Sequence, residues 1–263
     1  MIPLYKFPSS PHAESHWDRK YIAEGRPPEN GAAYLRQPFV HDILHVLTPG
    51  QYVLDAGCGT GGLLRFLHGR GFRVAGVDTS QAAIEIVQRA EPDIEAAIAG
   101  IEQLPFPDAS FDAYLAIGSW EYPPHGPEGA AREAVRVLKP GGFLFIEVPH
   151  ANVLRRLTYL PLKRLELRMQ RARGQRPEFS HHFFTTADLR TVLERHGCDA
   201  LDIRPHDLPE RERHFGLWVD WPFLRGGPHY VLNGAGRAVK AVGNAISPWT
   251  IATGMFIVAR KRS

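Results

Sequence analysis

The chain has 263 residues, of which 44% are hydrophobic and 22% charged, and its formal net charge is +3. These values are typical of a soluble globular protein with one large domain and insertions. The net charge is too small to indicate nucleic acid as a partner. No apolar stretch has the length of a membrane span or of a signal-peptide core. Cys58 and Cys198 are too few for a disulfide framework or a zinc site, so we expect a protein of the reducing cytoplasm without a bound metal.

Residues 1 to about 30 are rich in proline, histidine and charge, which is typical of an arm or lid that needs the rest of the protein to order it. Trp17 and Tyr21 are the exception, because they stand four residues apart in a helix-capable segment and would share one face. Packing on the core is the simpler interpretation of these two rings. A second helix is predicted from about Leu35 to Leu47.

Strand-length apolar runs alternate with helix-length segments from Tyr52 to Val148. Such alternation builds a parallel sheet with right-handed crossovers, and ligands then bind at the carboxyl ends of the strands. The predicted strands are 52–56, 72–77, 94–98, 111–117 and 143–148, and the predicted helices are 63–68, 80–90 and 130–138. Further along, we expect a helix capped at Thr185 to Asp188 and strands at 200–204 and 254–260.

A glycine loop at Val53 to Gly62 joins the first of these strands to its helix, and glycine lets backbone N–H groups approach a bound molecule closely. Asp78 ends the next strand, 21 residues after Gly57, where a carboxylate can accept hydrogen bonds from ribose hydroxyls. The pair predicts a nucleotide site. Two alternatives stay open at this point: a bare α/β fold, and the G-x-G-x-x-G fingerprint of dinucleotide-binding oxidoreductases, which Gly57, Gly59 and Gly62 also fit.

Four stretches together resemble the class I S-adenosylmethionine-dependent methyltransferases, in their small-molecule branch with the type 11 domain. They are Val53 to Gly62, Asp78, Leu104 to Asp112 and Arg136 to Gly142. The resemblance covers roughly residues 50 to 150. It implies a Rossmann-like methyltransferase fold, that is, a doubly wound, mostly parallel seven-stranded sheet with helical insertions, and S-adenosyl-L-methionine as the cofactor.

The resemblance also implies roles for particular residues. The backbone of the glycine loop would pack along the methionine part of the cofactor, Asp55 would help to hold the loop, and Asp78 would hold the ribose. The full set of expected cofactor-binding residues is Asp55, Gly57, Cys58, Gly59, Thr60, Gly61, Asp78, Thr79, Ile101, Glu102, Ile117 and Gly118. Two departures stand out, because Gly100 replaces the family's adenine-binding acid and Tyr122 stands where many relatives have histidine.

The acceptor is expected to be an oxygen or carbon of a small-molecule or lipid-like compound. Methyltransferases that modify amino groups of adenine or glutamine carry Asp/Asn-Pro-Pro-Tyr/Phe after the fourth strand, and this chain has Gly118-Ser119-Trp120-Glu121-Tyr122 there. A hydroxyl acceptor would need a base near the methyl group. The candidate catalytic residues are His150, His181, Glu121 and Tyr122. Two other readings stay open: an NAD(P)-dependent oxidoreductase and a non-catalytic cofactor-binding protein of the same fold.

Two insertions are expected beside the cofactor-binding core. We expect an N-terminal arm with helices at 1–48, the core at 49–150, a basic helical insertion at 151–180, and a C-terminal part of the same domain at 181–263 with a second insertion at 205–250. The first insertion has Leu162, Leu165 and Met169 at helical spacing among eight basic residues. This pattern fits a core-facing stripe under a solvated charged face, or a surface that meets a membrane, an anionic lipid or an acidic substrate. The second insertion is rich in aromatic residues that either line an apolar pocket or pack in a core. The oligomeric state stays open.

Overall fold

The computed structural model describes residues 1–6, 17–18, 21, 34–208, 210 and 212–263. The chain divides into two compact units. The core unit comprises residues 11–147, 190–202 and 257–263, and the insertion unit comprises residues 1–10, 148–189 and 203–256.

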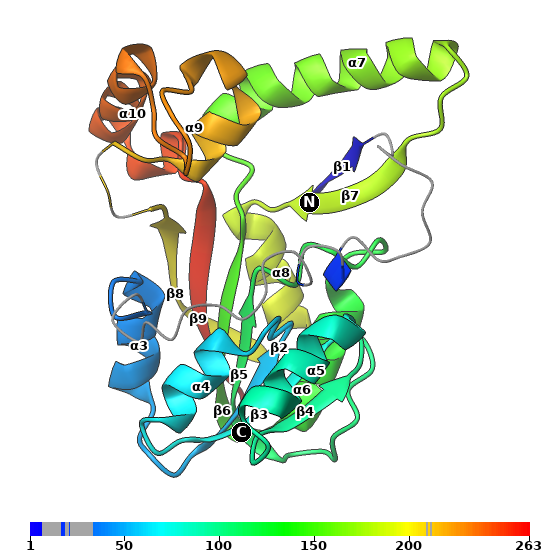
Figure 1. The fold of residues 1–263 in the computed structure, drawn as a ribbon, viewed down its shortest axis with the longest axis vertical. Coiled ribbons are helices and arrows are strands. Elements are labelled where there is room, and N and C mark those ends of the chain that lie inside the picture. Colours follow the sequence, from blue (N-terminus) through cyan, green and yellow to red (C-terminus); the bar gives the residue numbers. More distant parts are fainter. Residues whose placement is uncertain (7–16, 19–20, 22–33, 209, 211) are drawn as a thin grey trace. The chain divides into compact units, whose positions relative to one another are not determined.

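A single large sheet confirms the predicted α/β fold (Figure 1). Its seven strands are β2 (Tyr52–Ala56), β3 (Arg73–Asp78), β4 (Glu95–Ile98), β5 (Phe111–Ile117), β6 (Leu138–Pro149), β8 (Cys198–His206) and β9 (Gly254–Lys261), in the order β4-β3-β2-β5-β6-β9-β8. The pairings of β2 with β3, β2 with β5, β3 with β4 and β5 with β6 are parallel. The order reverses between β2 and β5, and the carboxyl ends of strands at such a switch point frame the crevice in which α/β proteins bind ligands.

Helices join these strands along the chain, and α4, α5 and α6 lie beside the strands that they connect (Figure 1). The helices are α3 (Pro38–Val46), α4 (Gly62–His68), α5 (Gln81–Ala90), α6 (Glu128–Val137) and α8 (Thr186–Arg195). The α5 helix has an apolar face in which Ile84 and Val87 are buried, and Ser80 caps its start by accepting a hydrogen bond from the N–H of Ala83 at 3.2 Å. The predicted cap of α8 is also present, because Thr185 and Asp188 bond to each other's backbone N–H.

The start of β6 differs from the prediction. The strand begins at Leu138, not at 143, because Leu138 pairs with Phe111 in the parallel ladder and the register then shifts before Ala113. Gly141, with φ +74°, lies in this irregular stretch. Residues 139–142, which separate the predicted helix from the predicted strand, are therefore part of β6.

A second, two-stranded sheet lies in the insertion unit and was not predicted. The strand β1 (Ile2–Lys6) runs antiparallel to β7 (Glu178–Phe183), with Ile2 opposite Phe183 and Leu4 opposite His181. Residues 2–6 are therefore a strand and not part of an irregular arm. The rest of the expected arm lies largely outside the described residues.

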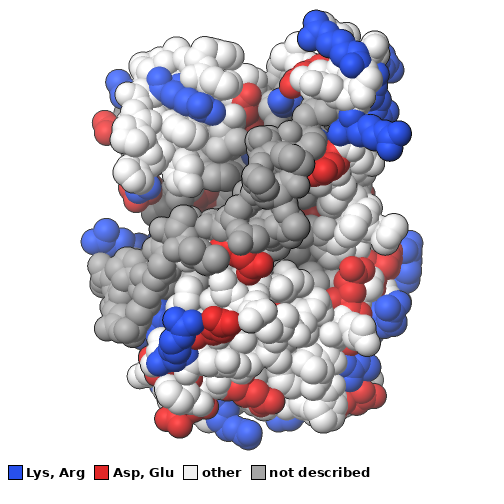
Figure 2. Space-filling view, turned by 45° about the vertical axis from the view of Figure 1, so that its right-hand side comes forward, with Lys and Arg blue, Asp and Glu red and all other residues white. Residues whose placement is uncertain are grey.

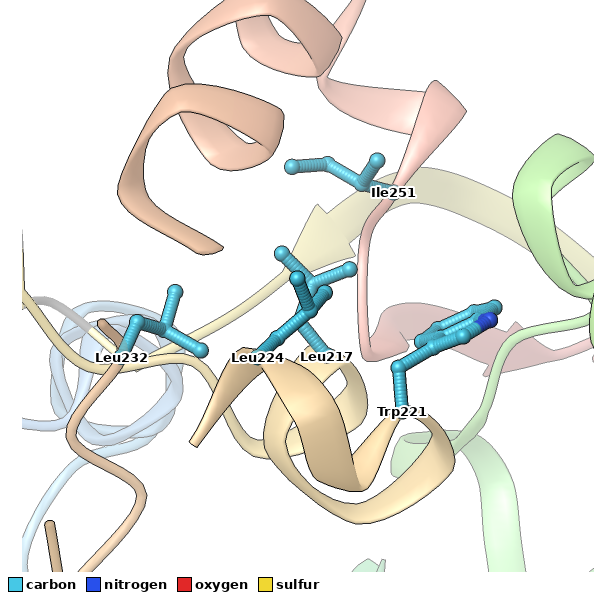
Figure 3. Close-up of a cluster of buried hydrophobic side chains, with 5 residues drawn as sticks. All are labelled: Leu217, Trp221, Leu224, Leu232 and Ile251. Carbon is cyan, nitrogen blue, oxygen red and sulfur yellow. The ribbon is translucent and has the colours of Figure 1, made fainter. Parts of the chain in front are cut away.

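The remaining elements of the insertion unit are the π-helical turn η1 (Arg155–Tyr159), α7 (Leu160–Ala172), α9 (Phe215–Asp220), the short 3-10 turns η2 (Pro222–Leu224) and η3 (Pro248–Thr250), and α10 (Gly234–Ile246). A small apolar core holds α9 and its neighbours together, and its side chains converge in Figure 3: Leu217, Trp221, Leu224, Leu232 and Ile251. Of the aromatic residues expected in the second insertion, Trp221 packs in this core and Phe223 is 73% exposed.

A buried ion pair joins η1 to α9 within the insertion unit. The Nε of Arg155 lies 2.6 Å from Oδ2 of Asp220, and both side chains are buried. The guanidinium also donates to the carbonyl oxygens of His150 and Thr253. Arg155, one of the eight basic residues of the first predicted insertion, is therefore buried in the fold and does not lie on a solvated face. Among the helices in the described part of the chain, none is long and apolar enough to cross a bilayer.

Candidate functional site

The glycine loop between β2 and α4 contacts the loop that follows β5. Gly57 has φ +98°, and a Cβ atom placed on it would lie only 2.6 Å from Cβ of Ser119. Both the backbone conformation and the space therefore require glycine at this position. The contact brings the ends of β2 and β5 together at the switch point of the sheet.

The N–H groups of this loop are used inside the protein. Those of Gly57 and Cys58 both donate to the carbonyl oxygen of Val77, at 2.8 and 2.9 Å, and that of Gly59 donates to Oδ2 of Asp78 at 2.9 Å. These three N–H groups are therefore not free donors for a ligand. Of this loop, Gly57 lines the pocket at the strand ends.

Asp78 at the end of β3 organises the loop and also lines a pocket. Its Oδ1 accepts the N–H of Ser80 and its Oδ2 accepts the N–H of Gly59, both at 2.9 Å. Burial raises the pKa of this carboxyl, and the hydrogen bonds from Ser80 and Gly59 oppose that rise. Each carboxylate oxygen has a further lone pair, so Asp78 can still accept a hydrogen bond from a ligand hydroxyl.

The pocket at these strand ends has a volume of about 320 Å³, within the usual range for small-molecule sites. It lies wholly in the core unit. Its lining comes from the glycine loop, the ends of β3 and β4, the loop after β5, and the N-terminal segment: Trp17, Tyr21, Gly57, Asp78, Thr79, Ala99, Gly100, Ile101, Glu102, Gly118, Ser119, Tyr122, Pro123 and Pro124.

Three aromatic rings form one wall of this pocket. Trp17 stacks on Tyr21 with 5.9 Å between ring centroids and meets Tyr122 edge to face at 5.1 Å. Asp18 joins this wall to the start of α5, because it accepts hydrogen bonds from Oγ of Ser80 and from the N–H of Ala82. Trp17 and Tyr21 therefore line a pocket, and the simpler expectation of core packing is wrong for them.

The expected cofactor-binding residues separate into two groups. Gly57, Asp78, Thr79, Ile101, Glu102 and Gly118 all line the pocket. The others lie around it: Asp55 and Cys58 are buried at the end of β2 and in the loop, Gly59, Thr60 and Gly61 lead into α4, and Ile117 ends β5. Burial, with the nearby Asp78, raises the pKa of Asp55 to about 7. The role of each in cofactor binding remains a prediction.

The four candidate catalytic residues also separate. Tyr122 lines the pocket, and Glu121 is buried beside Gly118, which lines it. His150 and His181 belong to the insertion unit. His150 is buried and its Nδ1 bonds the carbonyl oxygen of Phe184 at 3.1 Å, whereas His181 lies on β7. Burial lowers the pKa of each imidazole to about 4, which makes both weak bases at neutral pH.

Among the residues at the site that were not predicted to serve it are Trp17, Asp18, Ser119 and Glu147. Trp17 is marked by its spacing from Tyr21, and Ser119 by its place directly after the strand-ending Gly118. Glu147 gives no such signal, because a single acid in an apolar strand reads as an ordinary surface residue. In the described part of the chain, no three His, Cys, Asp or Glu side chains are grouped so as to hold a metal ion.

Comparison with known proteins agrees with this geometry. Residues 54–146 match the methyltransferase domain family. Over 119 residues, 41% of this chain and 36% of the other, the sequence is 40% identical to 2-methyl-6-phytyl-1,4-hydroquinone methyltransferase of Synechocystis sp.. Over 106 residues, 38% of each chain, it is 39% identical to phthiotriol/phenolphthiotriol dimycocerosates methyltransferase 1 of Mycobacterium ulcerans.

A similar fold occurs in the crystal structure of Burkholderia thailandensis 1,6-didemethyltoxoflavin-N1-methyltransferase with bound 1,6-didemethyltoxoflavin and S-adenosylhomocysteine, with a TM-score of 0.55, 17% identity and full coverage of both chains. Residues 54–146 therefore form the part of the chain that is similar to a methyltransferase domain. The chain matches well under half the length of the two curated relatives named above.

Proposed function

We propose that the protein is an S-adenosyl-L-methionine-dependent methyltransferase that acts on an oxygen or carbon of a small-molecule or lipid-like acceptor. One observation carries the proposal: the pocket at the switch point is built from the same strand ends and loops that the methyltransferase motifs occupy. The bare backbone at Gly57, the carboxylate of Asp78 and the aromatic wall all face one space there.

The residues present fit this cofactor. Gly57 lines the pocket with its backbone, and Asp78 has oxygen lone pairs for ribose hydroxyls. The rings of Trp17, Tyr21 and Tyr122 favour a positive charge over their faces, which is worth about 0.5–2 kcal/mol per cation–π contact. When bound, S-adenosylmethionine supplies an electrophilic methyl group on a sulfonium sulfur. The protein then has to align the acceptor and exclude water.

The groups at the pocket suit an acceptor that carries a proton. Burial raises the pKa of the Tyr122 phenol, so the phenol stays protonated and serves as a hydrogen-bond donor. Burial also raises the pKa of Glu121 well above its ordinary value, with a further contribution from Glu147. A carboxyl of this kind is a stronger base than an exposed one, and we assign Glu121 before His150 and His181 as the candidate base.

The acceptor class is supported by the relatives. The two curated enzymes are named for a phytyl hydroquinone and for phthiotriol dimycocerosates, both with long apolar parts. An oxygen or carbon acceptor on a molecule of this kind is consistent with the loop after β5, which lacks the Asp/Asn-Pro-Pro-Tyr/Phe pattern. We expect no nucleic acid partner, and the cytoplasmic setting remains a prediction that the two free, buried cysteines fit.

Helix α7 suits peripheral contact with an anionic lipid surface. Leu162, Leu165 and Met169 share one helical stripe and are 64%, 55% and 51% exposed, so the expectation of a core-facing stripe is wrong. In Figure 2, Lys and Arg gather at the upper right of the view. The basic residues that accompany the stripe in the sequence are Lys163, Arg164, Arg168, Arg171, Arg173 and Arg176. An apolar stripe flanked by cations is the pattern of helices that lie in the membrane interface.

A two-stage experiment tests the proposed activity. A thermal-shift screen should show stabilisation by S-adenosylhomocysteine and none by NADH, which separates a methyltransferase from an NAD(P)-dependent oxidoreductase. Incubation with methyl-labelled cofactor and fractionated metabolites should then yield a product heavier by one methyl group. Binding without any labelled product would favour a non-catalytic cofactor-binding protein.

A further inference from the structure

Two carboxyl groups meet at the end of β5, on the edge of the pocket. Ile117 of β5 is paired with Glu147 of β6, and the next residue, Gly118, donates its N–H to the carbonyl oxygen of Glu147 at 3.0 Å. A Cβ atom placed on Gly118 would lie 3.7 Å from Oε1 of Glu121 and 3.8 Å from Oε2 of Glu147. Both side chains therefore approach the same point, and Gly118 itself lines the pocket.

Polar atoms at this point lack partners within the described residues. Oε2 of Glu121 has no hydrogen-bond partner although the residue is only 4% exposed, and Oγ of the adjacent Ser119, which lines the pocket, has none either. An unpaired buried carboxyl oxygen costs free energy unless a proton or a ligand satisfies it. The two unpaired atoms therefore indicate that a polar group of a bound molecule is their partner.

No cation balances the two carboxyls in the described part of the chain, where the ion pairs include neither Glu121 nor Glu147. The titratable groups that face them are each other, Tyr122 and, beside Tyr122, Tyr21. Both carboxyls approach Gly118, and the charge of Glu147 disfavours ionisation of the buried Glu121, so we expect the pair to retain a proton near neutral pH. Burial raises the pKa of Glu147 to about 7, which agrees with this charge state.

We propose that Glu121 and Glu147 share one proton and together take up the proton that the methyl acceptor loses. This inference rests on the proposed function. The bond between the acceptor atom and its hydrogen breaks, and its electron pair forms the new bond to the methyl carbon. The methyl–sulfur bond breaks and its electron pair stays on sulfur. The proton passes to the singly charged pair, so a sulfonium, a neutral acceptor and a singly negative pair become three neutral groups. Glu147, which is partly exposed, then returns a proton to solvent.

The proposed protonation of the pair can be tested without the methyl acceptor, by measuring how many protons are exchanged when a ligand binds. A positive sulfonium favours the singly negative pair, whereas the neutral sulfur of S-adenosylhomocysteine favours the fully protonated pair. The two ligands should therefore bind with different proton exchange, by about one proton at most. Calorimetric titration of the full chain with each ligand at pH 7, in phosphate and in Tris, measures this number because the two buffers differ in ionisation enthalpy.

The expected result is that S-adenosylmethionine releases more protons than S-adenosylhomocysteine, and that the difference is lost in Glu147→Gln and in Glu121→Gln. Glu85→Gln, an exposed glutamate on α5, is the matched control and should keep the difference. Equal proton exchange for the two ligands in the unaltered protein, or a difference that persists in both glutamine variants, overturns the proposal. If neither ligand binds the unaltered protein, the proposed function itself fails and the pair's role falls with it, a result distinct from binding without proton linkage.

Discussion

The backbone N–H of Gly59 donates a 2.9 Å hydrogen bond to Oδ2 of Asp78, which links the glycine loop to the end of the neighbouring strand. Because the other oxygen of Asp78 accepts the N–H of Ser80, one carboxylate fixes both the loop and the start of α5. The same side chain lines the pocket. One side chain therefore both supports the loop and lines the pocket.

Replacement of Asp78 should affect both roles. Asp78→Ala leaves the N–H groups of Gly59 and Ser80 without their acceptor, so we expect the free energy of unfolding to fall by about 1–3 kcal/mol. Asp78→Asn keeps one carbonyl oxygen and should lose less. Urea denaturation measures the stability of both variants, and calorimetry with S-adenosylhomocysteine should show weaker binding in the same order. An alanine variant as stable as the unaltered protein would remove Asp78 from the loop's support.

Substitution of Gly57 should destabilise the loop, because φ is +98° and the added Cβ would lie 2.6 Å from that of Ser119. We expect Gly57→Ala to lower the free energy of unfolding by at least about 1–3 kcal/mol from backbone strain. Gly100→Ala is a matched control at the same pocket, since nothing lies within 4 Å of its Cβ position, and its unfolding should change little. Equal midpoints of chemical denaturation for the two variants would contradict this explanation.

The main elements of the core unit were predictable because their signals are local. Apolar runs ended by glycine or aspartate marked β2, β3 and β5, and the structure places β2 and β5 within the predicted bounds. The strand β1 was not predicted because its five residues include a proline and its partner β7 lies more than 170 residues away. Its pairing is a long-range contact that sequence pattern does not reveal.

The candidate site also combines residues that a local motif predicts with a residue that only strand pairing brings to it. Gly57 and Asp78 follow from a short motif, and both line the pocket. Glu147 becomes part of the site only because the parallel register of β5 and β6 sets it opposite Ile117. The loop that carries Glu121 follows Ile117 directly. The stripe of α7 left two alternatives open for a related reason: helical spacing indicates an apolar face but not what covers it.

The pH dependence of stability should reveal the state of Glu147. Its pKa is about 7 in the folded protein, against 4.5 for the ordinary group, so the folded state binds the extra proton between these values. The contribution of Glu147 to the free energy of unfolding should therefore fall as the pH rises from about 4.5 to 7 and level off above. The stability of Glu147→Gln relative to the unaltered protein should rise across the same window in denaturant titrations. A pH-independent difference would show that Glu147 titrates normally.

Helix α7 should bind anionic vesicles through its exposed stripe. Sedimentation with phosphatidylglycerol vesicles should retain the protein, and retention should decrease in high salt and with phosphatidylcholine. The triple change Leu162→Ser, Leu165→Ser and Met169→Ser should reduce binding severalfold. Ile246→Ser on α10, which removes a side chain that is 73% exposed, is the control and should bind as before. If the vesicles retain the unaltered protein and both variants equally, or do not retain the unaltered protein, then this surface does not bind lipid.

The central claim is that the pocket lined by Gly57, Asp78 and Tyr122 holds an adenosyl sulfur cofactor. Titration calorimetry of the full chain with S-adenosylhomocysteine, with NADH as the comparison ligand, tests it most directly. We expect one S-adenosylhomocysteine to bind per chain and NADH to give no heat of binding. Binding of NADH, with no binding of S-adenosylhomocysteine or S-adenosylmethionine, would contradict the account.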